Sequence, residues 1–114
     1  MTSTTTIHRH DVRVPLLGHS DRARTAIALS VLDNGWALVT YRKADGTRVE
    51  RIATRNPTII GALGTASDKQ AVRVSAEGTF GIVYWDQFAG GIRSFRVEGL
   101  ESIFILAYSP EDNH

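Results

Sequence analysis

The stretch "WALVTYRKADGTRVERIAT", residues 36–54, decides the fold because it has the pattern of a β-hairpin. Two extended runs, 36–43 and 47–54, flank the Ala-Asp-Gly turn at 44–46. An Asp-Gly pair between extended runs is one of the strongest hairpin signals in a short sequence. The hairpin places this region in a β-sheet, and the rest of the chain can be read outward from it.

Before the hairpin, residues 20–34 have the pattern of one amphipathic helix. Ser20 is a suitable N-cap, Asp21 suits the positive end of the helix dipole, and Asn34-Gly35 supplies the stop. The spacing predicts a buried stripe, with the arginines at 22 and 24 facing water. Its expected members are Ala23, Ile27 and Val31, flanked by Ala26 and Ser30. Residues 10–18 read as an extended lead-in that packs Val14, Leu16 and Leu17 onto the domain.

After the hairpin, Asn56-Pro57 is expected to end the second strand, because proline cannot donate to a ladder. The phase of the strand around residues 49–52 is ambiguous, and a bulge there is one interpretation. A small-residue loop with at most one helical turn is expected over 58–70. Further strands are expected at 71–75, 79–86, 92–97 and 103–108, with turns at 76–78 and 87–91 and a 3₁₀ turn at 98–102.

The predicted fold class is therefore mainly β (α+β): an N-terminal helix followed by a small barrel of five to six strands. With 114 residues the chain has room for one domain, expected over 13–109, between a disordered tail at 1–12 and a frayed tail at 110–114. It has no cysteine, no apolar run of membrane-spanning length and no apolar signal-peptide core. These features predict a cytoplasmic protein without disulfides or a membrane segment.

The net charge of +1 conceals an asymmetry between the two halves of the sequence. Residues 1–55 carry nine Lys/Arg and five Asp/Glu, a net of +4, whereas residues 56–114 carry four and seven, a net of −3. This balance lacks the strongly basic composition of a dedicated nucleic-acid-binding protein. Binding to nucleic acid would therefore depend on a local basic patch.

Two segments carry a family resemblance. The first runs from Tyr41 to Pro57 and contains Lys43, Asp45-Gly46-Thr47, Thr54 and Asn56; the second contains Trp85-Asp86 and Arg93-Ser94-Phe95-Arg96. In order and spacing they resemble the small phage-borne WYL-like family, which has an Sm-like (Src-homology-3-like) β-barrel fold. Ile92 stands where that family usually has tryptophan. The resemblance implies a barrel of the kind found in nucleic-acid-associated and ligand-sensing proteins, and it implies a phage or mobile-element origin.

The candidate site is a group of basic residues on the predicted strands: Arg42, Lys43, Arg48, Arg51, Arg55, Arg93 and Arg96. Trp36, Tyr41, Trp85 and Phe95 are interleaved with them. Arginines beside stackable rings would suit a nucleic-acid groove. In the competing interpretation the rings are core residues and the arginines form a solvated rim. Alternation further suggests that Arg93 pairs with Asp86 or Asp45, and that Arg96 faces outward.

Other chemistry has little support in the sequence. His8 and His10 share one face of an extended chain, but no carboxylate cluster at metal spacing accompanies them. There is no nucleophile elbow, and Gly61 and Gly64 lack a phosphate-loop lysine. We therefore expect a protein without catalytic activity, cofactor or metal.

Two functions follow, one for each kind of partner. The first is electrostatic, weakly sequence-specific binding of nucleic acid, DNA in preference to RNA, in the host cytoplasm or nucleoid if the protein is phage-encoded. The alternative is a protein-interaction module that docks on a host factor or assembles into a homo-oligomer. Its expected apolar contacts are Leu38, Phe104 and Leu106. A nucleotide-like ligand in the barrel mouth ranks third, because no phosphate-binding loop is visible.

Overall fold

The computed structural model describes residues 12–16, 18–74 and 81–106. Its centre is the expected hairpin, formed by β2 (Ala37–Arg42) and β3 (Arg48–Thr54), which pair in antiparallel register from Ala37↔Ala53 to Arg42↔Arg48. Gly46 has φ +89°, a conformation that favours glycine. The Asp45 carboxylate accepts a hydrogen bond from the amide of Thr47 at 2.9 Å. The predicted hairpin is confirmed.

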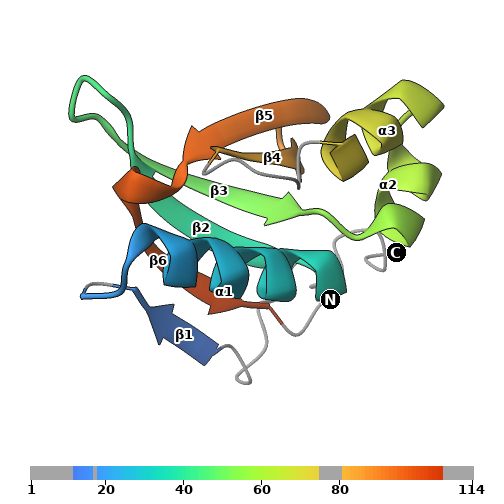
Figure 1. Ribbon diagram of the computed structural model, residues 1–114. Coiled ribbons are helices and arrows are strands. Elements are labelled where there is room, and N and C mark those ends of the chain that lie inside the picture. Colours follow the sequence, from blue (N-terminus) through green and yellow to red (C-terminus); the bar gives the residue numbers. More distant parts are fainter. Residues whose placement is uncertain (1–11, 17, 75–80, 107–114) are drawn as a thin grey trace, which may run out of the picture.

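Six strands form one antiparallel sheet in the order β1-β6-β2-β3-β4-β5 (Figure 1). The other four strands are β1 (Val12–Pro15), β4 (Gly81–Asp86), β5 (Gly91–Arg96) and β6 (Leu100–Ile105). A 3₁₀ turn, η1 (Val97–Gly99), connects β5 to β6 as the Glu-Gly-Leu pattern suggested. The lead-in is confirmed as an extended segment, since β1 pairs with β6. The six-stranded sheet with a helix before its hairpin agrees with the expected α+β class and a small Sm-like fold.

Helix α1 (Asp21–Asn34) is confirmed, and the Ser20 hydroxyl accepts a hydrogen bond from the amide of Ala23 at 3.1 Å. The predicted buried stripe was wrong by one position. The fully buried residues are Ala28 and Leu32, whereas Ala26 and Ser30 are exposed. The helix packs on the sheet through Ala28 and Leu32, and Ile27 and Val31 beside them are only partly buried.

Arg24 was expected to face water and instead ties α1 to the β5–β6 connection. Its Nη1 donates to the carbonyl oxygens of Val97, Glu98 and Leu100 at 3.2–3.4 Å. These carbonyls lie in and just after η1, where a short helix leaves acceptors without partners of its own. Arg24 therefore positions the 3₁₀ turn against the helix.

The segment after β3 differs most from the expectation. Instead of a loop over 58–70 and a strand over 71–75, the structure has α2 (Pro57–Leu63) and α3 (Ala66–Val74). Asn56 accepts hydrogen bonds from the amides of Thr58 and Ile59 and so caps α2, with proline at its first position. The bulge considered for β3 is absent, since β2 and β3 pair without interruption; the register shift lies between β2 and β6, at Thr40/Tyr41.

Two apolar clusters cover the two faces of the sheet. The first packs α1 residues such as Leu32 against Val39, Tyr84 and Phe95 of the strands. The second includes Ile60 and Val72 of the two later helices, with Trp36 and Trp85. No helix within the described residues has the length and apolar composition that crossing a membrane requires. Val12, expected at the end of the disordered tail, begins β1 instead. The rest of the expected tails, the His8/His10 pair, Leu17 and the turn at 76–78 lie outside the described residues.

Candidate functional site

A groove opens where β3 and β4 diverge. These two strands pair only at Ala53↔Asp86 and Thr54↔Trp85, although β4 pairs with β5 along its whole length. Two adjoining hollows lie beside the unpaired part, with cavity volumes of about 910 and 540 Å³. They share four lining residues: Tyr41, Lys43, Val83 and Ser94. We refer to the two together as the groove, to the 910 Å³ part as the large hollow and to the 540 Å³ part as the small hollow.

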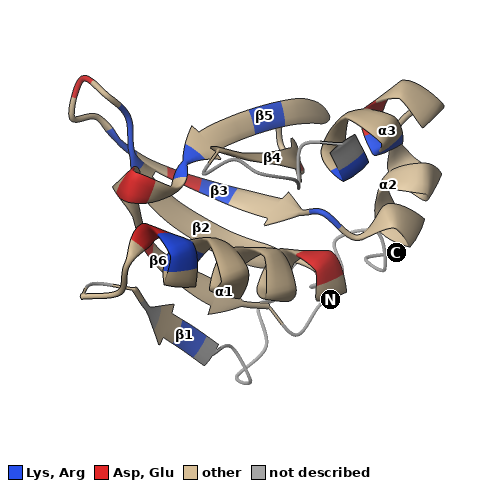
Figure 2. Ribbon diagram, viewed as in Figure 1, with Lys and Arg blue, Asp and Glu red and all other residues tan. Residues whose placement is uncertain are grey.

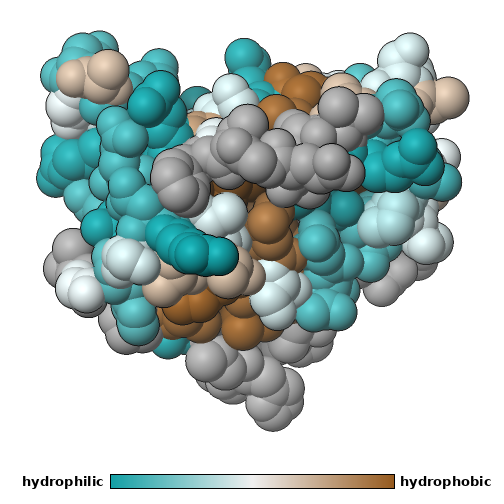
Figure 3. All heavy atoms as spheres, viewed as in Figure 1, coloured by the Kyte–Doolittle hydropathy of each residue, from teal (hydrophilic) through white to brown (hydrophobic). Residues whose placement is uncertain are grey.

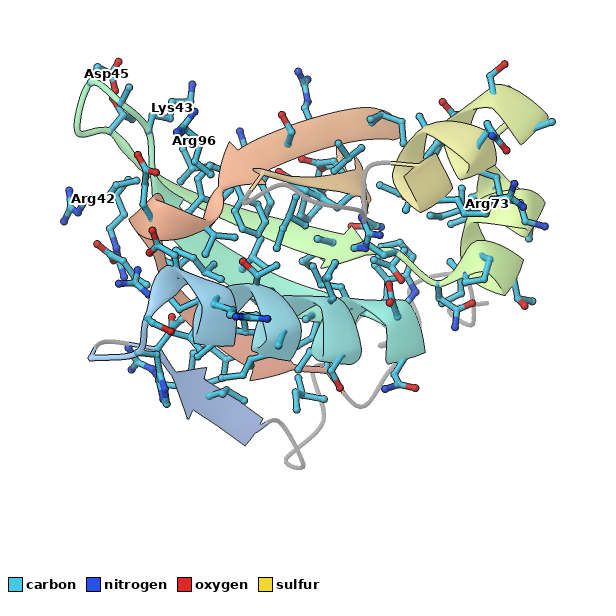
Figure 4. The ribbon with its side chains drawn as sticks, in the orientation of Figure 1. Arg42, Lys43, Asp45, Arg73 and Arg96 are labelled. Carbon is cyan, nitrogen blue, oxygen red and sulfur yellow. The ribbon has the colours of Figure 1, made fainter. Side chains whose placement is uncertain are left out.

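Among the charged side chains that line the groove, basic ones outnumber acidic ones. Five cations line it: Arg42, Lys43 and Arg96 in the large hollow, and Arg51, Arg93 and again Lys43 in the small one. The only carboxylate among the lining residues is Glu98, which belongs to the large hollow. Figure 2 shows the basic positions on the arm of the β2–β3 turn, on β3 and on β5. Figure 4 shows Arg42, Lys43 and Arg96 gathered near that turn, with Arg73 at the opposite end of the molecule.

Beside the groove, Glu101 of β6 holds the arginines at the base of the hairpin. Arg42 Nε lies 2.7 Å from one oxygen of Glu101, and Arg48 Nε lies 3.3 Å from the other. Arg42 and Arg48 face each other across β2 and β3, so this carboxylate offsets the repulsion between like charges. The hydrogen bond from Arg42 lowers the pKa of Glu101 below its ordinary value. Both arginine side chains remain half exposed.

On the β5 side, the cations differ in their partners. Arg96 Nε lies 3.3 Å from Glu98, and both side chains are exposed, by 77% and 57%. Within the described part of the chain, no ion pair or side-chain hydrogen bond is found for Lys43 or Arg93. An exposed ion pair stabilises a protein little, so its cation can exchange a carboxylate for a phosphate at small cost. Within the described residues, the groove therefore has two cations without an ion pair, Lys43 and Arg93, and one in an exposed ion pair, Arg96.

Asp86, the expected partner of Arg93, pairs with Arg51 instead. Asp86 Oδ2 lies 3.2 Å from Arg51 Nε, and the carboxylate is buried while the arginine is 45% exposed. The geometry is that of an ion pair without a well-aligned hydrogen bond to Oδ2. Asp86 Oδ1 accepts from the amides of Phe88 and Ala89 and so caps the turn between β4 and β5. The sequence signal for this cap was available, since an aspartate directly before a Gly-containing turn favours such bonds.

Arg55 is separate from the other six basic residues. Its side chain is only 3% exposed, and it lies under α1 and α3. It donates to the Asp33 carboxylate at 3.1 Å and to the carbonyl oxygens of Val83 and Val72 at 2.6 and 3.1 Å. The structure thus places Arg55 as a link between α1, α3 and β4, away from the groove.

The interleaved aromatic rings are core residues. Tyr41 stacks on Phe95 with ring centroids 4.9 Å apart, and its hydroxyl lies 3.1 Å from that of Tyr84. Burial raises the pKa of Tyr84 far above its ordinary value. Trp36 and Trp85 are 3% and 6% exposed in the second apolar cluster. The four interleaved rings are therefore not available as stacking platforms.

The apolar residues named for a protein contact are mostly covered. Leu38 and Phe104 are partly buried, Leu106 is 7% exposed, and Leu38 packs against the second cluster. On the face shown in Figure 3, the described apolar residues appear as separate small areas. Among the described residues, no group of three or more His, Asp or Glu side chains is arranged to hold a metal ion.

Comparison with protein families identifies the class that this sheet and groove define. A family model described as WYL_2, Sm-like SH3 beta-barrel fold, matches residues 27–101. The match spans well over half of the 114 residues, and the chain belongs to this family. No curated protein and no solved structure matches the chain.

Proposed function

We propose that this protein is a non-enzymatic binding module that holds nucleic acid, DNA in preference to RNA, through the groove. The observation that carries the proposal is the charge of the lining, where five cations accompany one carboxylate. The resemblance to phage-borne proteins extends the proposal to a mobile-element protein acting in the host cytoplasm or nucleoid.

The proposed mechanism is electrostatic because the described residues that line the groove include five cations and no exposed aromatic ring. Its two aromatic rings, Tyr41 and Phe95, are 7% and 4% exposed, so they cannot stack on bases. Guanidinium and ammonium groups bind phosphates in any sequence, which makes recognition weakly sequence-specific. Each phosphate contact releases counterions, so affinity falls steeply with salt.

The test is a salt titration of binding to a labelled DNA duplex and to the matching RNA, using the double variant Lys43→Gln/Arg93→Gln. Within the part of the chain that the structure describes, these two side chains line the groove without an ion pair. We expect the variant to bind more weakly and to flatten the plot of log K against log salt by about two units, because each phosphate contact on duplex DNA contributes roughly 0.9. DNA should bind more tightly than RNA.

The matched control is Arg22→Gln/Arg73→Gln, which removes the same charge from exposed positions on α1 and α3 outside the groove. Its slope should remain close to that of the wild-type protein. Equal flattening by both double variants would show that only net charge matters and would remove the groove from the proposal. Binding of DNA that does not weaken with salt, or a salt-tolerant complex with a protein or with a second copy, would contradict the proposal.

A further inference from the structure

Among the described residues, Asp86 is the one fully buried carboxylate, and its ion-pair partner Arg51 lines the groove. We propose that Asp86 is a positioning residue that fixes Arg51 as a rigid cation in the small hollow, ready to receive a phosphate. The inference rests on the proposed function and names the residue pair that matters most within it.

The first support is the immobility of the carboxylate. The Asp86 side chain is 1% exposed, and Oδ1 accepts from the amides of Phe88 at 2.9 Å and Ala89 at 3.0 Å. With Oδ1 held by two backbone donors, the carboxylate has a fixed orientation. Oδ2 is then directed at Arg51, whose Nε lies 3.2 Å away.

The second support is how Arg51 itself is held. Its Nε faces Asp86, and its Nη1 donates to the carbonyl oxygen of Glu50 at 2.9 Å. Within the described residues, no partner is found for Nη2. Arg51 lines the small hollow, which has no carboxylate in its lining and also receives Lys43 and Arg93. A hydrogen bond from Nη1 and the ion pair between Nε and Asp86 therefore hold the guanidinium, while Nη2 remains for a ligand.

Arg96 shows the contrast within the same groove. Its partner Glu98 is 57% exposed, and Arg96 itself is 77% exposed, so neither end of that pair is fixed. Binding a phosphate would cost Arg96 the conformational entropy of a long side chain, whereas a cation that is already anchored loses less. Asp86 and Glu98 thus carry the same charge, but only Asp86 restricts the conformation of the arginine that it pairs with.

This difference gives opposite predictions for two variants with the same change in charge. Asp86→Asn keeps Oδ1 as a cap for the turn and removes a negative charge from beside the groove. If only net charge mattered, Asp86→Asn would bind DNA more tightly. If Asp86 positions Arg51, the same variant should bind DNA more weakly. We expect about two- to ten-fold weaker binding, the effect of freeing one rotamer-rich side chain. Glu98→Gln, the matched control, should bind as tightly as the wild-type protein or more tightly.

A coupling measurement separates positioning from structural damage. In an Arg51→Gln background, Asp86→Asn should cause no further loss of DNA affinity, because the side chain that it positions is gone. Damage to the fold would lower affinity in both backgrounds. Arg51→Lys, which keeps the charge and loses the anchored guanidinium, should weaken binding without flattening the salt plot.

A readout that needs no ligand keeps this inference separate from the proposed function. We expect the Nε–Hε group of Arg51 to be rigid by ¹⁵N relaxation in the wild-type protein and mobile in Asp86→Asn, with Arg96 mobile in both. If the wild-type protein binds no DNA, the proposed function fails while relaxation still shows whether Asp86 fixes Arg51. A mobile Arg51 in the wild-type protein, or unchanged or tighter DNA binding by Asp86→Asn, would overturn the inference.

Discussion

Arg55 and Arg96 show how far two arginines in one chain can differ in role. Arg55 is 3% exposed and holds three elements together, whereas Arg96 is 77% exposed beside the groove. Burial decides between the roles, because a buried guanidinium must satisfy its donors within the protein. Arg55 does so with the Asp33 carboxylate and the carbonyl oxygens of Val72 and Val83.

Replacing Arg55 should therefore damage stability rather than binding. Arg55→Met leaves two buried carbonyl oxygens without these donors, and we expect the free energy of unfolding to fall by about 2–4 kcal/mol. Arg73→Met, an exposed replacement on α3, should change it by no more than about 0.5 kcal/mol. Urea denaturation followed by circular dichroism measures both. A loss for Arg55→Met as small as that for Arg73→Met would show that the buried hydrogen bonds contribute little.

For single residues, the sequence predicts which basic side chains lie near the groove better than it predicts which residues they pair with. It identified six basic residues that lie at or beside the groove, but it also included Arg55 and paired Asp86 with Arg93. Burial of Arg55 depends in part on α3, which was expected to be loop and strand. The pairing of Asp86 with Arg51 depends on where β3 and β4 diverge, which no local pattern contains.

At the scale of elements, α2 and α3 are the clearest difference between expectation and structure. Gly61 and Gly64 in a run of small residues favour a loop, and the valines at 72 and 74 favour a strand. Helix capping outweighs the loop preference of the glycines and the strand preference of the valines. Asn56 caps α2, and Thr65 and Asp68 exchange hydrogen bonds in a reciprocal cap at the start of α3. These capping residues were visible in the sequence. The apolar contacts of Ile60 and Val72 in the second cluster further stabilise the two helices.

The two helix caps give a prediction for the elements that they begin. Asn56 accepts two amide hydrogen bonds and donates to the carbonyl oxygen of Asp33, whereas Ser20 caps α1 with one bond at an exposed position. Asn56→Ala should lower the free energy of unfolding by about 1–2 kcal/mol, and Ser20→Ala by about 0.5–1 kcal/mol. Thermal or urea unfolding compares them directly. Equal losses, or a larger one for Ser20→Ala, would contradict this ranking.

For the whole molecule, the sheet was largely predictable because its strands are bounded by strong turns. Asp45-Gly46, the turn at 87–91 and the Glu-Gly step at 98–99 set where strands end, and the family resemblance supplied the expectation of a small Sm-like fold. The capping residues of α2 and α3 were visible in the sequence, but the packing of these helices and the groove were not. Both depend on contacts between residues far apart in the chain.

Glu101 makes an identifiable contribution to how the stability of the whole folded protein changes at acidic pH. Its pKa lies below the ordinary 4.5 because Arg42 and then Arg48 donate hydrogen bonds to it. A lowered pKa in the folded state stabilises the protein above pH 4.5, and this stabilisation is lost as the pH falls through the lowered value. Glu101→Gln should therefore melt at a slightly lower temperature than the wild-type protein at neutral pH.

The two melting curves should converge well below pH 4.5, where Glu101 is protonated in both the folded and unfolded states. The difference at neutral pH should be small, because exposed ion pairs contribute little. Scanning calorimetry across the acid range measures it. A difference in melting temperature that stays constant down to strongly acidic pH would contradict this origin.

The contact between Gly99 and Arg42 determines what the side chains of the groove can and cannot alter. A Cβ atom at position 99 would collide with the carbonyl oxygen of Arg42, so at this end the turn after β5 lies backbone against backbone on the end of β2. At the other end, the ladder between β3 and β4 fixes the spacing. The width of the groove is thus set by main chain at both ends. Substitution of the lining side chains over evolution can therefore change the charge of the groove while the groove keeps its shape.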